Sequence, residues 1–426
     1  MKVESRNRAV ACLQAARALR SVGQGVAIVD MALLLKALGW RATAIGGVLS
    51  AAGVVGAALI LLCGPLSDRI GRKPFLLAYE CMTCAAALAV ALSRNPALLT
   101  AAIVLTGLGR GQNGAAGPFT PVEQAWMAEN VPRDRRSRVF SANTAIGFFG
   151  VAAGCLLAGL DHVWRNALPG ALAFRPLFCG IAGLSLACAF IVWLAPGGGM
   201  AGQRRAALRE QAPSSRQVER PASDGMRFRP DPQRKAENRN IARLAFVNVL
   251  NGLGVGFVGP MMSYWFATKF GATSGEIGGT LAASFAVTGI AALVSGYLSA
   301  RFGMVRAVVW LRLAGVGLMC ALPFMPTFAL ASVLYAARSA LSRGTQGARS
   351  ALGASLTGDD RRGFSLSMNS FFTRAASAVG PTISGWLLDE GSLALPFVFA
   401  AGLQLVSTVL YGVFFRGYDV ELERRA

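Results

Sequence analysis

Histidine and acidic residues are scarce in this sequence. The chain holds one histidine, His162, and 42 Lys and Arg residues outnumber 21 Asp and Glu residues among its 426 positions. A lone histidine without neighbouring cysteines or carboxylates does not make a metal site. No nucleophile is paired with a base, and no P-loop or dinucleotide-binding glycine pattern occurs. We therefore expect no enzyme, no bound metal and no cofactor.

Charged residues as a group are also few. They make up 15% of the chain, against 54% hydrophobic residues, which is too apolar for a soluble globule of this length. The net charge of +21 would indicate a nucleic-acid partner in a soluble protein. Here most of the bases fall between apolar runs, so membrane topology explains them and no nucleic-acid partner is expected.

Twelve apolar segments are long enough to cross a lipid bilayer, which takes about 20 residues each. The predicted spans are 14–36, 43–63, 75–93, 98–119, 139–160, 176–195, 241–267, 277–298, 306–325, 328–348, 364–388 and 393–415. The predicted fold class is an all-α polytopic membrane protein with twelve transmembrane helices. Residues 196–240, rich in Arg, Pro, Gln and Ser, predict a largely disordered cytoplasmic linker between domains 1–195 and 241–426.

The distribution of bases predicts the orientation of the chain. With the N-terminus inside, the inner segments and the linker carry most of the Lys and Arg residues. The outer loops then hold only Arg41, Arg94, Arg165, Arg175 and Lys269. We expect a multi-pass protein of the cytoplasmic (inner) membrane, monomeric, with both termini in the cytoplasm.

One loop between the second and third spans is dense in charge. It reads Gly64-Pro-Leu-Ser-Asp68-Arg69-Ile-Gly71-Arg72-Lys-Pro, a single acid among three bases. This spacing between two spans resembles the signature loop of the major facilitator superfamily. The resemblance implies a gating loop, in which Asp68 packs against the cytoplasmic start of the eleventh helix and latches that side shut. An ordinary positively charged inner loop is the alternative.

The second half of the chain repeats the first. Gly64-x-Leu-Ser-x-Arg69-x-Gly71 returns 232 positions on (296 − 64), with Ala300 in place of Asp68, and Gly23-x-Gly returns 231 positions on (254 − 23). Asp134-Arg-Arg and Asn143 return 226 positions on (360 − 134, 369 − 143). These matches predict two pseudo-symmetric six-helix bundles.

Two ionisable residues inside predicted spans are candidates for proton coupling, because such residues are costly in a bilayer. Asp30 lies roughly 15 Å from Arg20 along the first helix, which predicts a position near the midplane. Arg110 opens Arg110-Gly-Gln-Asn113-Gly, which resembles the superfamily's second motif. The resemblance implies proton transfer or substrate contact at Arg110. Structural pairing within the helices is the alternative for both residues, and a position at a helix end is a further alternative for Asp30.

Polar side chains in the spans predict a substrate cavity at mid-depth. The candidate lining residues are Asp30, Arg110, Asn113, Asn143, Asn251, Arg338, Asn369 and Arg374. The resemblance implies a secondary active transporter that moves a small organic molecule by alternating access, with proton-coupled efflux the leading interpretation. The excess of arginines keeps uptake of a small organic anion open as an alternative. A non-transporting sensor or scaffold of the same fold is a third.

Overall fold

The computed structural model describes residues 2–110, 120–132, 135–197, 232–346, 349, 352 and 371–423. Within these ranges, the side chains of 2–5, 64–65, 68–69, 120–121, 136–138, 232–237, 292–302, 304 and 418–423 lie outside the described part. The described residues form helices joined by short loops and include no strand.

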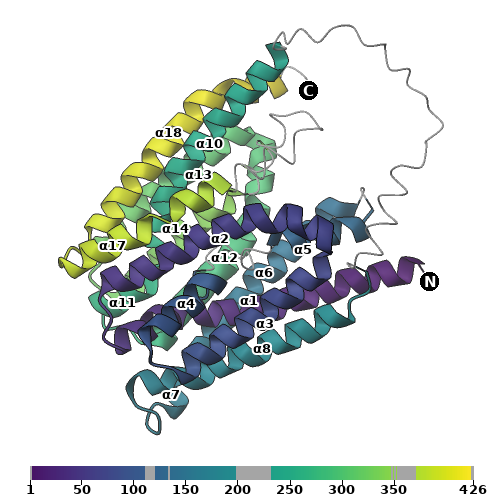
Figure 1. The fold of residues 1–426 in the computed structure, drawn as a ribbon. Coiled ribbons are helices and arrows are strands. Elements are labelled where there is room, and N and C mark those ends of the chain that lie inside the picture. The colour runs from purple at the N-terminus through teal and green to yellow at the C-terminus, as the bar shows by residue number, and fades with distance from the viewer. Residues whose placement is uncertain are drawn as a thin grey trace.

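The N-terminal half is built from the helices that precede the linker (Figure 1). They are α1 (Lys2–Ala37), α2 (Ala42–Ile70), α3 (Arg72–Leu92), α4 (Pro96–Thr106), α5 (Thr120–Asn130), α6 (Arg136–Ala158), α7 (Asp161–Trp164), the 3₁₀ helix η2 (Gly170–Phe174) and α8 (Arg175–Leu194). Asn95 caps the start of α4 with its side chain, and Gly107 ends α4 in the left-handed conformation.

The C-terminal half follows the same plan. Its elements are α10 (Pro232–Val258), α11 (Met262–Lys269), α12 (Ser274–Phe302), α13 (Met304–Ala321), η3 (Leu322–Phe324), α14 (Phe328–Gly344), α17 (Gly380–Asp389) and α18 (Leu395–Glu423). A helical segment at 371–377 precedes α17. Since α10 begins at Pro232, helix replaces the last part of the linker predicted at 196–240. Residues 198–231 of that linker lie outside the described part.

Eight stretches of the described chain are apolar and long enough to cross a membrane. Their outward faces carry large apolar side chains, such as Leu62, Trp193, Trp310 and Val413, each more than half exposed. An exposed apolar surface of this kind suits lipid rather than water. The helical architecture therefore agrees with the predicted polytopic fold class.

The bundle has two ends, which we name by the chain termini. The terminal end is where α1 begins and α18 ends, and the distal end is where Ala37 and Asp389 lie (Figure 1). The two halves lie together at the distal end and diverge toward the terminal end (Figure 1). Most of the described contacts between the halves join α2 to α17 and α6 to α12, and α1 adds contacts with α11 and α12.

The apolar core is divided in the same way. The largest described cluster is continuous across both halves and joins residues such as Ile45 and Val151 to Phe257 and Phe285. Nearer the terminal end, each half has a separate core, centred on Trp126 in the first half and on Tyr411 in the second. One shared core and two separate cores allow the halves to rock about the shared region.

Candidate functional site

A carboxylate from the second half caps a helix of the first half at the distal end. Asp389 accepts hydrogen bonds from the backbone N–H groups of Ala42 and Thr43, each at 2.9 Å, and from the Thr43 hydroxyl at 2.6 Å. The N-cap residue of α2, Arg41, provides no side-chain cap. The start of a helix attracts negative charge, so the Asp389 carboxylate stabilises the start of α2. Because Asp389 belongs to α17, this contact links the second half to the first.

Close backbone packing extends this contact along α2 and α17. A Cβ atom added to Gly385 would lie 2.2 Å from the carbonyl oxygen of Ala42, so only glycine fits there. Deeper in the bundle, the Thr382 backbone N–H donates to Ser50 Oγ at 3.1 Å, and the two hydroxyl oxygens are 2.7 Å apart. The distal end is therefore closed by direct contact between the halves.

Asp30 lies in this distal contact. It is fully buried and accepts a hydrogen bond from the hydroxyl of Ser274, the first residue of α12. The Ser274 oxygen also lies 3.2 Å from the carbonyl oxygen of Ala158 on α6. The position predicted near the midplane is corrected, because Asp30 meets the distal start of α12 and is only roughly 10 Å from the distal end of α1. Burial of a carboxylate between the halves still costs free energy when it is ionised.

Arg110 lies between the halves at mid-depth. Its Nη2 atom donates to Ser377 Oγ at 3.4 Å, and the Ser377 hydroxyl donates to the carbonyl oxygen of Arg374 at 2.9 Å. Ser377 precedes the distal end of α17 by twelve residues, which is roughly 18 Å of helix (389 − 377). Gly53 on α2 makes room for the guanidinium, since a Cβ atom there would lie 1.7 Å from Arg110 Nη1.

The surroundings of Arg110 are positive. The charge of Arg374, from the other half, acts on Arg110, and neither side chain forms an ion pair with any described carboxylate. Ser377 thus links the Arg110 guanidinium to the main chain of Arg374 in the other half, and no described carboxylate pairs with either arginine. Such a region attracts an anion that fits between the halves.

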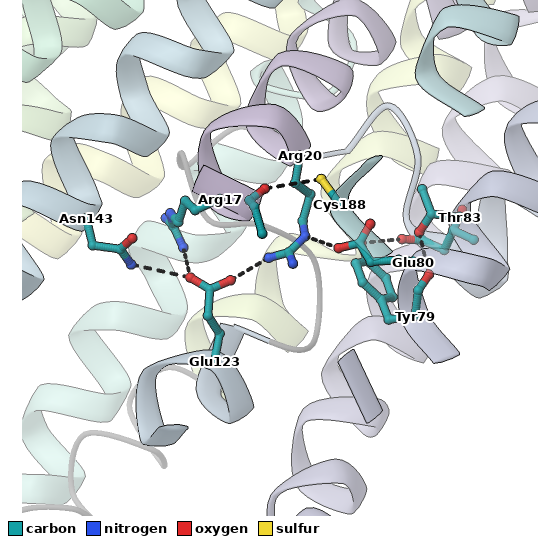
Figure 2. Close-up of polar contacts among 10 residues, drawn as sticks. Arg17, Arg20, Tyr79, Glu80, Thr83, Glu123, Asn143 and Cys188 are labelled. Carbon is teal, nitrogen blue, oxygen red and sulfur yellow. Dashed lines mark hydrogen bonds and ion pairs between the residues drawn. The ribbon is translucent and has the colours of Figure 1, made fainter. Parts of the chain in front are cut away.

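A buried polar network fills the terminal part of the first half (Figure 2). Arg20 lies between two carboxylates: its Nε atom is 2.5 Å from Glu80 Oε1, and its Nη1 atom donates to Glu123. Arg17 Nη1 lies 3.5 Å from Glu123 Oε1, and Asn143 Nδ2 donates to the same oxygen at 3.3 Å. All five side chains are buried.

The network joins four helices and carries no net charge. Two arginines of α1 meet one carboxylate of α3 and one of α5, while Asn143 adds α6. Buried ion pairs of this kind fix which helices meet, and removing one partner leaves a buried charge. Arg17, Arg20, Glu80 and Glu123 were not among the predicted site residues. The sequence feature that could have identified them is a pair of arginines three positions apart in the first helix, together with two acids in other helices.

Two predicted cavity residues of the second half, Asn251 and Arg338, are buried inside that half. Asn251 on α10 accepts a hydrogen bond from Arg312 on α13, and Asn248 Oδ1 accepts one from Arg349 Nη1 at 3.4 Å. Arg338 on α14 is also buried, with 5% of its surface exposed. The structure therefore brings Asn143 and Asn251 together with charged residues inside their own halves.

The predicted gating loop is described in part. Gly71 separates α2 from α3 with a φ of 112°, a conformation that favours glycine. Arg72 pairs with Glu129 at 2.8 Å, and Lys73 Nζ donates to the carbonyl oxygen of Trp193 at 2.6 Å. These contacts fasten the loop to the first half. The side chains of Asp68 and Arg69, and residues Asn113 and Asn369 altogether, lie outside the described part, while the backbone of Gly64 belongs to α2.

Comparison with known proteins identifies the family. The model of the major facilitator superfamily matches residues 15–234 and 244–425, so the chain belongs to this superfamily. A crystal structure of a mutant of the nucleoside transporter NupG superposes with a TM-score of 0.72 at 13% identity, covering 96% of this chain and 100% of that one. The predicted fold class and family resemblance are thereby confirmed. The chain is a polytopic membrane transporter, of a family whose members are generally not enzymes.

Curated relatives agree with this assignment. The gallate transporter of Pseudomonas putida is 29% identical over 395 residues, covering 86% of this chain and 82% of that protein. The uncharacterized MFS-type transporter YhjO of Bacillus subtilis is 31% identical over 132 residues, 30% of this chain. That match spans only 31% of the length of YhjO.

Proposed function

We propose that this transporter moves a small organic anion, whose acidic group binds between Arg110 and Arg374. The supporting observation is that Arg110 contacts Ser377 of the other half, whose hydroxyl donates to the main chain of Arg374, and that no described carboxylate pairs with either arginine. A guanidinium binds a carboxylate through two parallel hydrogen bonds, which a lysine cannot reproduce. An anion held by both halves can be passed from one side to the other as the halves rock.

One curated relative supports the same substrate class. Of the two curated relatives named above, the gallate transporter matches this chain over the greater length, and gallate is an aromatic carboxylate. Gly53 lets the Arg110 guanidinium pack directly against α2, which holds it between the two halves where such a ligand would bind. We infer a carboxylate-bearing substrate, with the particular acid to be found by assay.

We infer from the excess of bases in the terminal segments that the terminal end faces the cytoplasm, with the protein in an inner membrane. The distal end, closed by Asp389 and the contacts of Asp30, then faces outward. This arrangement corresponds to an inward-facing state of alternating access. The proposed latch of Asp68 belongs to the opposite, outward-facing state.

Asp30 is the proposed proton-binding residue. In the outward-open state the distal contact separates, and Asp30 meets water and accepts a proton. Closure buries Asp30 against Ser274, which favours the neutral acid because ionised carboxylates are costly to bury. Asp30 contacts α12 whereas Arg110 contacts the segment before α17, so proton and anion can occupy the protein together. Simultaneous occupancy favours proton-coupled uptake over the efflux expected from sequence.

Transport in proteoliposomes tests this proposal. Purified protein should accumulate a labelled aromatic monocarboxylate, after subtraction of protein-free liposomes, and should not accumulate its primary amide. An inward proton gradient should raise accumulation, and Arg110→Lys should lose most of it. Equal transport of acid and amide would contradict the substrate class, whereas proton entry that expels the acid would establish export.

A further inference from the structure

The buried polar network of the first half has a counterpart in the second half at the repeat offsets already seen in the sequence. The offset is 231 from Arg20 to Asn251 (251 − 20) and from Arg17 to Asn248 (248 − 17), 232 from Glu80 to Arg312 (312 − 80) and 226 from Glu123 to Arg349 (349 − 123). These are the same offsets that relate the glycine and Asp-Arg-Arg motifs of the two halves. The four positions of one network therefore correspond to the four positions of the other.

The contacts correspond as well as the positions. Arg20 binds Glu80 in the first half, and Arg312 donates to Asn251 in the second. In both halves this contact joins the first helix to the third, α1 to α3 and α10 to α13.

The second contact is conserved between the halves in the same way. The Arg17–Glu123 distance is 3.5 Å, and the Arg349–Asn248 distance is 3.4 Å. One framework of polar contacts, ion pairs in the first half and hydrogen bonds in the second, thus occurs twice at equivalent positions with different side chains.

The charges differ between the two networks. The first has two arginines and two glutamates, whereas the second has two arginines and two neutral amides. Arg312 is 3% exposed, and among described residues it forms no ion pair. Its Nη1 atom, Arg349 Nε and Arg338 Nε find no hydrogen-bond partner in the described part of the chain. The positive charges of Arg338 and Arg349 both act on Arg312.

We propose that a small monovalent anion of chloride size resides between Arg312 and Arg349, where it supplies the negative charge that Glu80 and Glu123 supply in the first half. Burying several guanidinium groups together without a counter-ion is costly, and a bound anion removes that cost. The near-complete burial of Arg312 favours a small ion over an organic acid. This site lies within the second half, among α10, α13 and α18, and does not depend on the proposed substrate site at Arg110.

Thermal unfolding of the full-length protein in detergent tests the proposal. At constant ionic strength, with gluconate as the bulky reference anion, chloride should raise Tm saturably by roughly 2–4 °C. Phosphate, which is a larger anion, should raise Tm less than chloride does. No difference between chloride and gluconate would overturn the proposal.

The isosteric substitution Asn251→Asp tests whether a fixed negative charge can replace the bound anion. It places a carboxylate beside Arg312, so the variant should have a raised Tm in gluconate and a response to chloride reduced at least about threefold. Asn95→Asp, on the exposed cap of α4, adds the same charge elsewhere and should respond to chloride as wild type does. An Asn251→Asp variant that responds like wild type would contradict the assignment.

Crystals grown in bromide locate the ion directly. An anomalous peak between Arg312 and Arg349 is expected in wild type and should be absent from Asn251→Asp, while no peak in wild type would overturn the site. Arg110→Gln separates this inference from the proposed function: it should abolish carboxylate transport and keep the chloride-dependent rise in Tm. Loss of that rise in Arg110→Gln would show that chloride acts at the substrate region instead.

Discussion

Asp389→Asn should weaken the distal closure of the transporter. The native carboxylate accepts three hydrogen bonds from the start of α2, at 2.9, 2.9 and 2.6 Å, and it also interacts with the dipole of that helix. The dipole contributes about 0.3–1 kcal/mol, and a hydrogen bond to a charged group about 1.5–3 kcal/mol. Since Asp389 is exposed, water screens its charge, and we expect a net loss of about 1–2 kcal/mol. That loss shifts the distal-closed to distal-open ratio by about 5- to 30-fold.

Spin labels on the distal surfaces of the two halves measure this shift. Cysteines introduced at Ala97 and Ala329, both exposed, can carry the labels in a background without the native cysteines. Double electron–electron resonance should show a larger population of long distances in Asp389→Asn than in wild type. Glu390→Gln removes the neighbouring acid, whose described hydrogen bond is from its backbone N–H to Trp386, and should leave the distribution unchanged. An Asp389→Asn distribution identical to that of Glu390→Gln would refute this reasoning.

Three further substitutions test other parts of the account. Gly53→Ala adds a methyl group 1.7 Å from Arg110 Nη1 and should raise KM for a carboxylate about tenfold. Gly56→Ala, which has nothing within 4 Å of the added methyl group, should leave KM unchanged. Equal KM values for the two variants would contradict the placement of Arg110. Glu80→Gln leaves Arg20 with one carboxylate and should destabilise the protein by about 3–5 kcal/mol in unfolding assays, a loss that Arg20→Gln in the same chain should partly reverse. Asp30→Asn should remove proton-driven accumulation and keep substrate exchange; accumulation at the full rate would assign proton coupling to another residue.

The sequence was sufficient to predict the helices and the two-half plan. Apolar runs of about 20 residues and the repeat offsets depend on local composition and on chain order, both of which are visible without a structure. The boundaries were less exact, because α10 starts at Pro232, within a segment whose polar composition predicted a linker. Helix can extend beyond the bilayer into polar sequence, where hydropathy no longer marks it.

The site could be predicted only in part. Intramembrane charge singled out Asp30 and Arg110, but the facing of a helix depends on tertiary packing. Counting residues along one helix placed Asp30 at mid-depth, and only its contact with Ser274 shows that it belongs to the distal interface. Asp389 was overlooked because a helix cap contributed by the other half leaves no local pattern near Ala42. The two buried networks differ in charge at corresponding positions. This difference could be recognised only by combining the repeat offsets with the observed contacts.

Equilibrium binding to the purified transporter tests the central claim most directly. Isothermal titration should compare an aromatic monocarboxylate with its primary amide, on wild type, Arg110→Gln and Arg374→Gln. The account predicts that wild type binds the acid at least about tenfold more tightly than the amide, a difference of about 1.4 kcal/mol, and that each variant loses this preference. Equal affinity of wild type for acid and amide, or an undiminished preference in both variants, would contradict the claim that Arg110 and Arg374 hold an anionic substrate.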